Sequence, residues 1–116
     1  MEELELLKLL LPEYLIDYYQ VMRYEKNGEE LHFYFEEKND IPEEYLKHRL
    51  SSKGFYDEVI IQDFPIRGHG AYLHIKRRRW MNHSTNMVVG RNWDLIAKGT
   101  RMTADFAAFL KEIRRF

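Results

Sequence analysis

Four consecutive cations, Lys76, Arg77, Arg78 and Arg79, form the part of this sequence best suited to binding chemistry. Side chains alternate along a strand, so a strand here places Lys76 and Arg78 on one face and Arg77 and Arg79 on the other. At least one pair must then meet solvent, an acidic partner or phosphate. Because arginine offers a planar fork of donors that grips phosphate or a guanine edge, the pattern favours nucleic-acid contact.

Trp80 and three cations further along the chain extend this candidate surface. The Trp80 ring can stack on a base or close the hydrophobic core, and the sequence leaves both roles open. Arg91, Lys98 and Arg101 follow downstream. The candidate DNA-binding residues are therefore Lys76, Arg77, Arg78, Arg79, Trp80, Arg91, Lys98 and Arg101.

A structural role is the alternative for the basic run. Charged side chains protect an edge strand from pairing with another chain. The acidic residues of the N-terminal half would then supply salt bridges to these cations.

Catalytic and metal-binding patterns are weak in this sequence. None of the histidines shows HExxH spacing or another recognised ligand pair, and no glycine-rich phosphate loop is present. We predict no catalytic residue, no metal ligand and no cofactor. A small metal-dependent nuclease, the weakest alternative, requires a histidine to converge with a carboxylate, with His69, His74 and His83 as the candidates.

Composition narrows the class of protein further. The chain has 116 residues, no cysteine, and 18 basic against 19 acidic residues. Absence of cysteine excludes thiolate zinc sites, iron–sulfur clusters and disulfides. The length predicts one domain, 1–116, and no apolar stretch approaches the roughly 20 residues that span a bilayer. We expect a cytoplasmic protein without membrane contact.

The near-neutral total conceals a charge division between two parts of the predicted domain. Residues 1–64 carry a net charge of −9, and residues 65–116 carry +8. Such asymmetry is a hint of nucleic-acid contact by the basic part, although the two halves could equally attract each other. We interpret 1–64 as an acidic helix plus hairpin scaffold, and 65–116 as a basic hairpin plus C-terminal helix.

Periodicity predicts the elements of the N-terminal half. Leucines at helical spacing over 4–11 predict an amphipathic helix. Pro12 either ends this helix near Leu10 or is the first residue of a second short turn over 13–17. Alternating residues over 30–37 predict a strand, which pairs with 18–25. Asn27-Gly28 between them favours the positive φ values of a type I′ hairpin turn.

The C-terminal half is predicted to hold a second hairpin and a helix. A strand that begins at residue 59 and is ended by Pro65, and a second strand over 71–80, flank the turn 67–70. They follow a helical turn within 42–50 and a break at 51–54. A turn over 82–86 leads to a short strand, 87–89. Thr103 is a suitable N-cap for a terminal helix with an apolar stripe, formed by Phe106, Phe109, Leu110 and Ile113.

The order of these segments resembles the N-terminal region of bacterial insertion-sequence transposases whose catalytic DDE domain lies downstream. The resemblance covers nearly the whole chain and implies binding to the element's terminal repeats. It is carried by LLKLLLPEYL (6–15), GEELHFYFEEKN (28–39), IIQDFPIRG (60–68), YLHIKRRRW (72–80) and WDLIAKGTRMTADFAAFLKEI (93–113).

The sequence departs from that family in one respect. Related transposases carry a cysteine zinc ribbon where this chain runs from Tyr72 to Trp93, and its cysteines are missing here. We expect a metal-free ribbon held by hydrophobic packing. The catalytic carboxylate triad is also absent, so Asp17, Asp63 and Asp94 are not assigned that role.

Together these features predict an α+β fold with an N-terminal helix, an antiparallel sheet from two β-hairpins, and a C-terminal helix packed on the sheet. The expected function is non-catalytic DNA binding at the ends of a transposable element. A protein-interaction module is the alternative: it docks on a separately encoded catalytic transposase subunit through Phe106, Phe109 and Phe116. The oligomeric state is left open.

Overall fold

The chain forms two compact units, each built from two separate stretches of sequence. The computed structural model describes residues 9, 11, 13–66, 68–98 and 104–113. The first unit comprises Met1–Lys38 and Val59–Ile75, and the second comprises Asn39–Glu58 and Lys76–Phe116. Within the described residues, no helix is long and apolar enough to cross a membrane.

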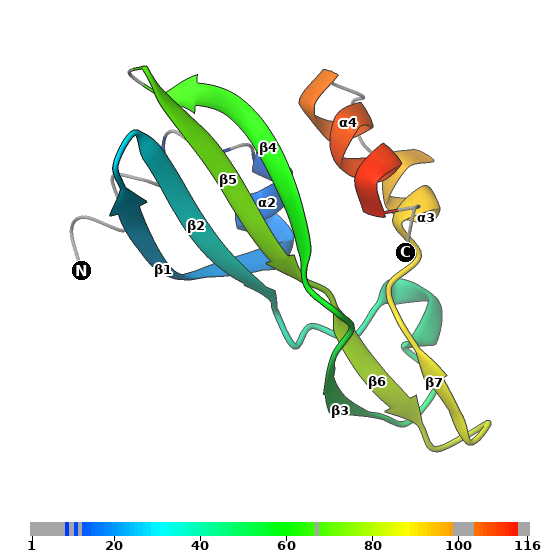
Figure 1. Cartoon of the computed structure of the whole chain (residues 1–116). Coiled ribbons are helices and arrows are strands. Elements are labelled where there is room, and N and C mark those ends of the chain that lie inside the picture. The colour runs from blue at the N-terminus through cyan, green and yellow to red at the C-terminus, as the bar shows by residue number, and fades with distance from the viewer. Residues whose placement is uncertain (1–8, 10, 12, 67, 99–103, 114–116) are drawn as a thin grey trace. The chain divides into compact units, whose positions relative to one another are not determined.

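The first unit contains helix α2 (Glu13–Tyr18) and a four-stranded sheet (Figure 1). The strand order is β1-β2-β5-β4, and α2 contacts β1. Two antiparallel hairpins make this sheet, as predicted. The strands are β1 (Tyr19–Asn27), β2 (Glu30–Glu37), β4 (Val59–Ile66) and β5 (His69–Lys76), of which Lys76 belongs to the second unit.

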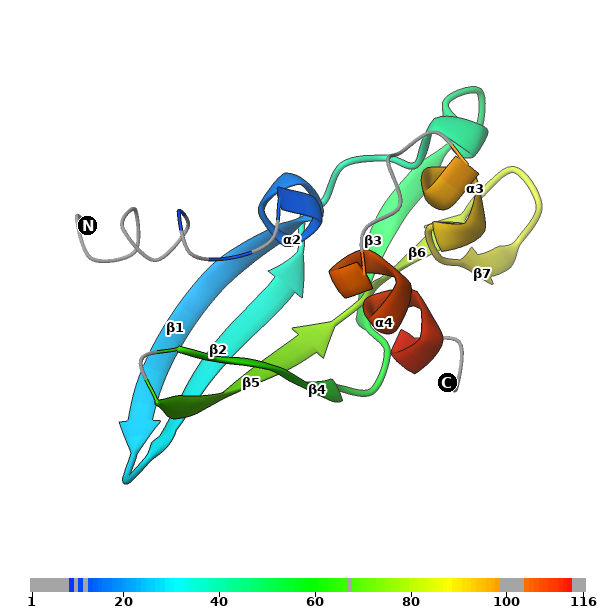
Figure 2. The same cartoon turned by 90° about the horizontal axis from the view of Figure 1, so that it is seen from above.

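The β1–β2 hairpin turns at Gly28 and Glu29 (Figure 2). Gly28 has a φ of +62°, whereas Asn27 is the last residue of β1 and pairs with Glu30. Positive φ at the first loop position alone is the pattern of a type II′ turn. The expected type I′ turn is therefore wrong, and the two loop residues are Gly28 and Glu29 in place of Asn27 and Gly28. Glycine takes this conformation without steric cost.

Alternation along the strands builds the core of the first unit. Phe33 and Phe35 of β2 are buried, as are Leu73 and Ile75 of β5. The side chains between them face the other side of the sheet, because successive residues of a strand point in opposite directions. This period of two is what made both hairpins predictable.

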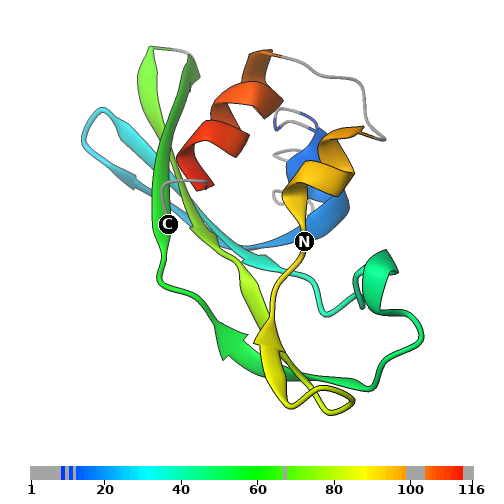
Figure 3. The ribbon, with the colours of Figure 1, turned by 90° about the vertical axis from the view of Figure 1, so that its right-hand side faces the viewer.

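The second unit contains a three-stranded sheet in the order β3-β6-β7 and three short helical segments. Figure 3 shows β7 leading into α3, with α4 beside it. The strands are β3 (Leu50–Phe55), β6 (Arg78–Asn82) and β7 (Met87–Val89). The helices are the 3₁₀ turn η1 (Glu43–Tyr45), α3 (Trp93–Lys98) and α4 (Ala104–Ile113).

Helix α4 buries the stripe that its sequence predicts. Phe106, Phe109, Leu110 and Ile113 are all buried. The Phe109 ring meets the Trp93 ring of α3 edge to face, with their centroids 5.5 Å apart. Thr103 lies outside the described residues, as does nearly all of the helix expected over residues 4–11.

The α+β class, the helices toward both ends of the chain and the antiparallel hairpins are confirmed. Other features differ from expectation. The stretch 51–54 belongs to β3, so the predicted break there is wrong, and the sequence patterns did not predict α3. The strand expected over 71–80 is divided into β5 and β6, with Arg77 between them.

Candidate nucleic-acid interface

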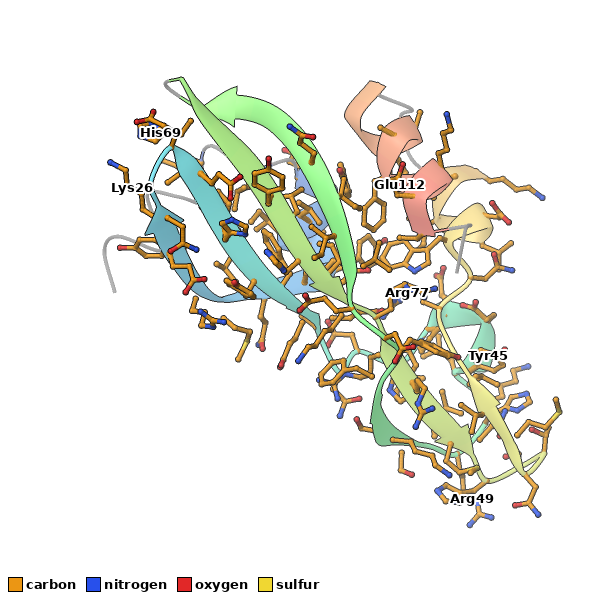
Figure 4. The ribbon with its side chains drawn as sticks, viewed as in Figure 1. Lys26, Tyr45, Arg49, His69, Arg77 and Glu112 are labelled. Carbon is orange, nitrogen blue, oxygen red and sulfur yellow. The ribbon has the colours of Figure 1, made fainter. Side chains whose placement is uncertain are left out.

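The basic run lies where the chain passes from β5 to β6. Lys76 ends β5, Arg77 belongs to neither strand, and Arg78 begins β6. The Tyr56 backbone N–H donates to the carbonyl oxygen of Arg77 at 2.8 Å, which fixes the backbone at this junction. Figure 4 labels Arg77 at this point. All four cations of the run are half-buried.

Arg77 and Arg79 converge on the ring of Tyr56. Their guanidinium carbons lie 5.1 Å and 5.8 Å from the centroid of that ring. Arg79 also donates through Nε and Nη2 to the carbonyl oxygen of Lys53, at 3.4 Å and 3.3 Å. The buried Nε of Arg77 has no hydrogen-bond partner in the described part of the chain.

Arg78 points to different partners. Its guanidinium donates to the hydroxyl of Ser52 and lies 4.7 Å from the centroid of the Phe55 ring. The expected separation of Arg77 and Arg79 from Arg78 therefore holds, even though the predicted single strand is interrupted.

Trp80 serves the core. It is completely buried, and its Nε1 donates to the side-chain oxygen of Asn39 at 2.9 Å. Of the two roles left open by the sequence, closing the core is the one this structure shows. The indole is not accessible to a base, so Trp80 does not contact DNA by stacking in this structure.

Arg91, the first of the downstream cations, does not extend the pair formed by Arg77 and Arg79. Arg91 lies over the Trp80 ring at 5.7 Å and donates to the carbonyl of Asp40 at 2.6 Å. Trp80 and Arg79 are adjacent on β6 and so face opposite sides of the strand. Lys98 is exposed at the end of α3, and Arg101 lies outside the described residues.

Two residues of this site were missed by the sequence reasoning. Tyr56 supplies the ring, and Lys53 supplies the carbonyl oxygen that holds Arg79. The register between β3 and β6 is irregular between Ser52 and Phe55, and Gly54 there has a φ of +76°. Gly54 was the available signal, since an isolated glycine in a strand indicates a bulge.

The end of the β6–β7 hairpin is held by hydrogen bonds around a buried amide. Asn82 is 1% exposed, and its amide lies 2.9 Å from Nδ1 of His48. The Ser84 backbone N–H donates to the Asn82 side-chain oxygen at 2.9 Å, and the Asn86 N–H to the Asn82 carbonyl at 2.7 Å. Hydrogen bonds to a buried side chain thus fix the end of this hairpin.

The start of β3 is tied to the same turn. The Arg49 backbone N–H donates to the hydroxyl of Ser84 at 3.2 Å, and the His83 N–H donates to the Arg49 carbonyl at 2.8 Å. The Ser51 hydroxyl lies 2.8 Å from Nε2 of His83. Figure 4 shows Arg49 at this end of the second unit.

A separate polar cluster occupies the first unit. His32 Nδ1 and His74 Nε2 lie 2.7 Å apart, and His32 Nε2 lies 3.0 Å from a carboxylate oxygen of Glu30. The spacing of the histidines in the sequence did not predict this contact, because His32 and His74 lie on different strands, β2 and β5. The described residues contain no group of three or more His, Cys, Asp or Glu side chains that could hold a metal ion. The cluster thus supplies no metal centre for the nuclease alternative.

Charge divides between the units. The second carries 13 basic and 8 acidic residues, a net of +5, and the first carries 5 and 11, a net of −6. Among the described residues, neither Arg77 nor Arg79 forms an ion pair with a carboxylate.

Comparisons of the chain with protein-family models, curated proteins and solved structures gave no match.

Proposed function

We propose that this protein binds DNA through Arg77 and Arg79, as a non-catalytic DNA-binding component of insertion-sequence transposition. One observation carries the proposal: two guanidiniums share the Tyr56 ring and have no carboxylate partner among the described residues. Positive charges without a counterion inside the protein attract an anion from outside it.

The contacts of both arginines prepare them for such a partner. The Tyr56 ring and the Lys53 carbonyl restrict the side chains, so less rotamer entropy is lost when a phosphate binds. Hydrogen bonds between guanidinium and phosphate are charge-assisted and often bidentate. The two arginines are therefore suited to gripping phosphate oxygens.

A linear polyanion fits the site better than a small anion does. Lys53 is exposed on β3, beside β6, and Arg49 is exposed at the end of the same sheet. Cations spread along two neighbouring strands can meet successive phosphates of a nucleic acid. Each phosphate neutralised releases condensed counterions, which adds to the affinity.

The transposition context rests on the resemblance of the sequence to transposase N-terminal regions. In that context the DNA is the terminal repeat of the element, and catalysis belongs to a separate domain or chain in the cytoplasm. The alternative function, docking on a catalytic subunit, would require an exposed apolar contact formed by Phe106, Phe109 and Phe116. Phe106 and Phe109 are buried, so they do not form an exposed apolar patch, and Phe116 lies outside the described residues.

Fluorescence anisotropy with a labelled duplex at low salt tests this function. The R77Q/R79Q variant should bind about 100-fold more weakly, since each lost charged hydrogen bond costs about tenfold. The matched control is R23Q/K26Q, which removes two cations from the first unit and should bind like the wild type. Absence of wild-type binding, or equal binding by both double variants, would contradict the proposal.

A further inference from the structure

The turn between β6 and β7 presents polar side chains to solvent at the end of the second unit. His83, Ser84, Thr85 and Asn86 are all exposed. Met87 follows at the start of β7, with 63% of its surface accessible. Amide, hydroxyl and apolar groups are thus gathered on one short loop.

Hydrogen bonds hold this turn in a fixed conformation. Within the turn, the backbone N–H groups of Ser84 and Asn86 donate to the side-chain oxygen and the carbonyl oxygen of Asn82, respectively. The Ser84 hydroxyl and the His83 ring are held by Arg49 and Ser51 at the start of β3. The side chains of Thr85 and Asn86 take no part in them. Asn86 has a φ of +63°, a left-handed conformation that asparagine tolerates better than most residues. A rigid loop therefore carries two polar side chains that are available to a ligand.

The distance from this turn to Arg79 matches the depth of a DNA groove. Arg79 precedes Asn82 by three residues on β6, which at about 3.3 Å per residue corresponds to about 10 Å. The major groove of B-DNA is about 8.5 Å deep. A turn that reaches the base edges thus leaves Arg79 near the level of the phosphates.

We propose that the β6–β7 turn enters the major groove of duplex DNA and that the Asn86 side chain reads an adenine. This inference rests on the proposed function and names the element that gives it sequence preference. An asparagine amide can donate to N7 and accept from N6 of adenine, a bidentate pairing that no other base pair offers in the major groove. The exposed Arg49 at the same end contacts a flanking phosphate.

Selection from a pool of randomised duplexes, followed by sequencing of the bound fraction, tests this inference on the full chain. Wild-type protein should enrich a site that contains a preferred adenine. N86G keeps the left-handed backbone but lacks the amide, so the preference at that position should fall about tenfold. N86D should move the preference toward cytosine, because a carboxylate accepts from cytosine N4.

Affinity of N86G for a non-specific duplex, and its salt dependence, should equal those of the wild type. Circular dichroism confirms that each variant is folded. Steep salt-dependent binding by a wild type that enriches no site, or the same site enriched by N86G, overturns the groove-reading role and leaves the proposed function standing. Preference for single strands also overturns it. No wild-type binding to any DNA overturns the proposed function as well.

Discussion

The single residue Tyr56 positions both guanidiniums of the proposed site. Replacing it with leucine removes the ring and should weaken duplex binding about fivefold, because each cation–π contact contributes about 0.5–1 kcal/mol. Y56F keeps the ring and should bind like the wild type. Anisotropy titrations at one salt concentration compare the three proteins. Equal affinity of Y56L and wild type would show that the ring does not prepare the arginines.

The sequence predicted part of this arrangement. Alternation alone separates Arg77 and Arg79 from Arg78, and the structure keeps that separation. Gly54 is a signal for the bulge in β3, but it does not reveal that Tyr56 lies beside Arg77, because that contact depends on the irregular register between β3 and β6. Trp80 remained ambiguous, since an indole beside cations suits both a core and a stacking surface.

The Glu25–Tyr34 pair in the first unit predicts a pH dependence. The Tyr34 hydroxyl donates to Glu25 at 2.8 Å, and with Arg23 it lowers the pKa of Glu25 below its ordinary value of 4.5. The Glu25 carboxylate in turn raises the pKa of Tyr34 above its ordinary value of 10.0. The pair should stabilise the fold fully between these ordinary values. That contribution is lost as pH falls through the lowered pKa of Glu25, or rises through the raised pKa of Tyr34.

Tyr34→Phe keeps the ring and removes the hydroxyl. The pKa of Glu25 should then rise toward its ordinary value, because its largest stabilising contact is gone. Carboxyl carbon NMR follows the titration directly. Tyr45→Phe, a change in the other unit, is the control and should leave Glu25 unaltered. An unchanged Glu25 titration in the Tyr34→Phe protein would refute the pairing.

At the scale of elements, the β6–β7 hairpin should depend on Asn82. N82A leaves the Ser84 N–H and the His48 ring without their partner, so the free energy of unfolding should fall by about 2 kcal/mol. Amide hydrogen exchange at Ser84 and Asn86 should accelerate. Thr85→Ala, in the same turn, is the control and should exchange at the wild-type rate. Unaltered protection in N82A would contradict the network's role.

Elements differed in how readily the sequence revealed them. The hairpins of the first unit and the stripe of α4 follow clear periods of two and of about 3.6 residues. Strand β3 has the sequence LSSKGF, whose polar residues and glycine resemble a loop. It becomes a strand through its pairing with β6 and through the bonds that join Arg49 to the turn. Such long-range partners leave no local signal in the sequence.

Charge is organised by unit at the scale of the whole molecule. Division of the sequence at residue 64 gave −9 and +8, whereas the structural units carry −6 and +5. The values differ because residues 65–75, which include Arg67, join the acidic first unit, while residues 39–58, with 3 basic and 5 acidic residues, join the basic second unit. The sequence therefore predicted the charge asymmetry, and the structure corrected its boundary.

The salt dependence of duplex binding tests the central claim most directly. The logarithm of the association constant should fall linearly with the logarithm of salt concentration. Loss of two phosphate contacts should make the slope for R77Q/R79Q shallower by about two units. R23Q/K26Q should keep the wild-type slope. A slope that is the same for wild type and R77Q/R79Q, or that changes equally in both double variants, would contradict the assignment of the DNA contact to Arg77 and Arg79.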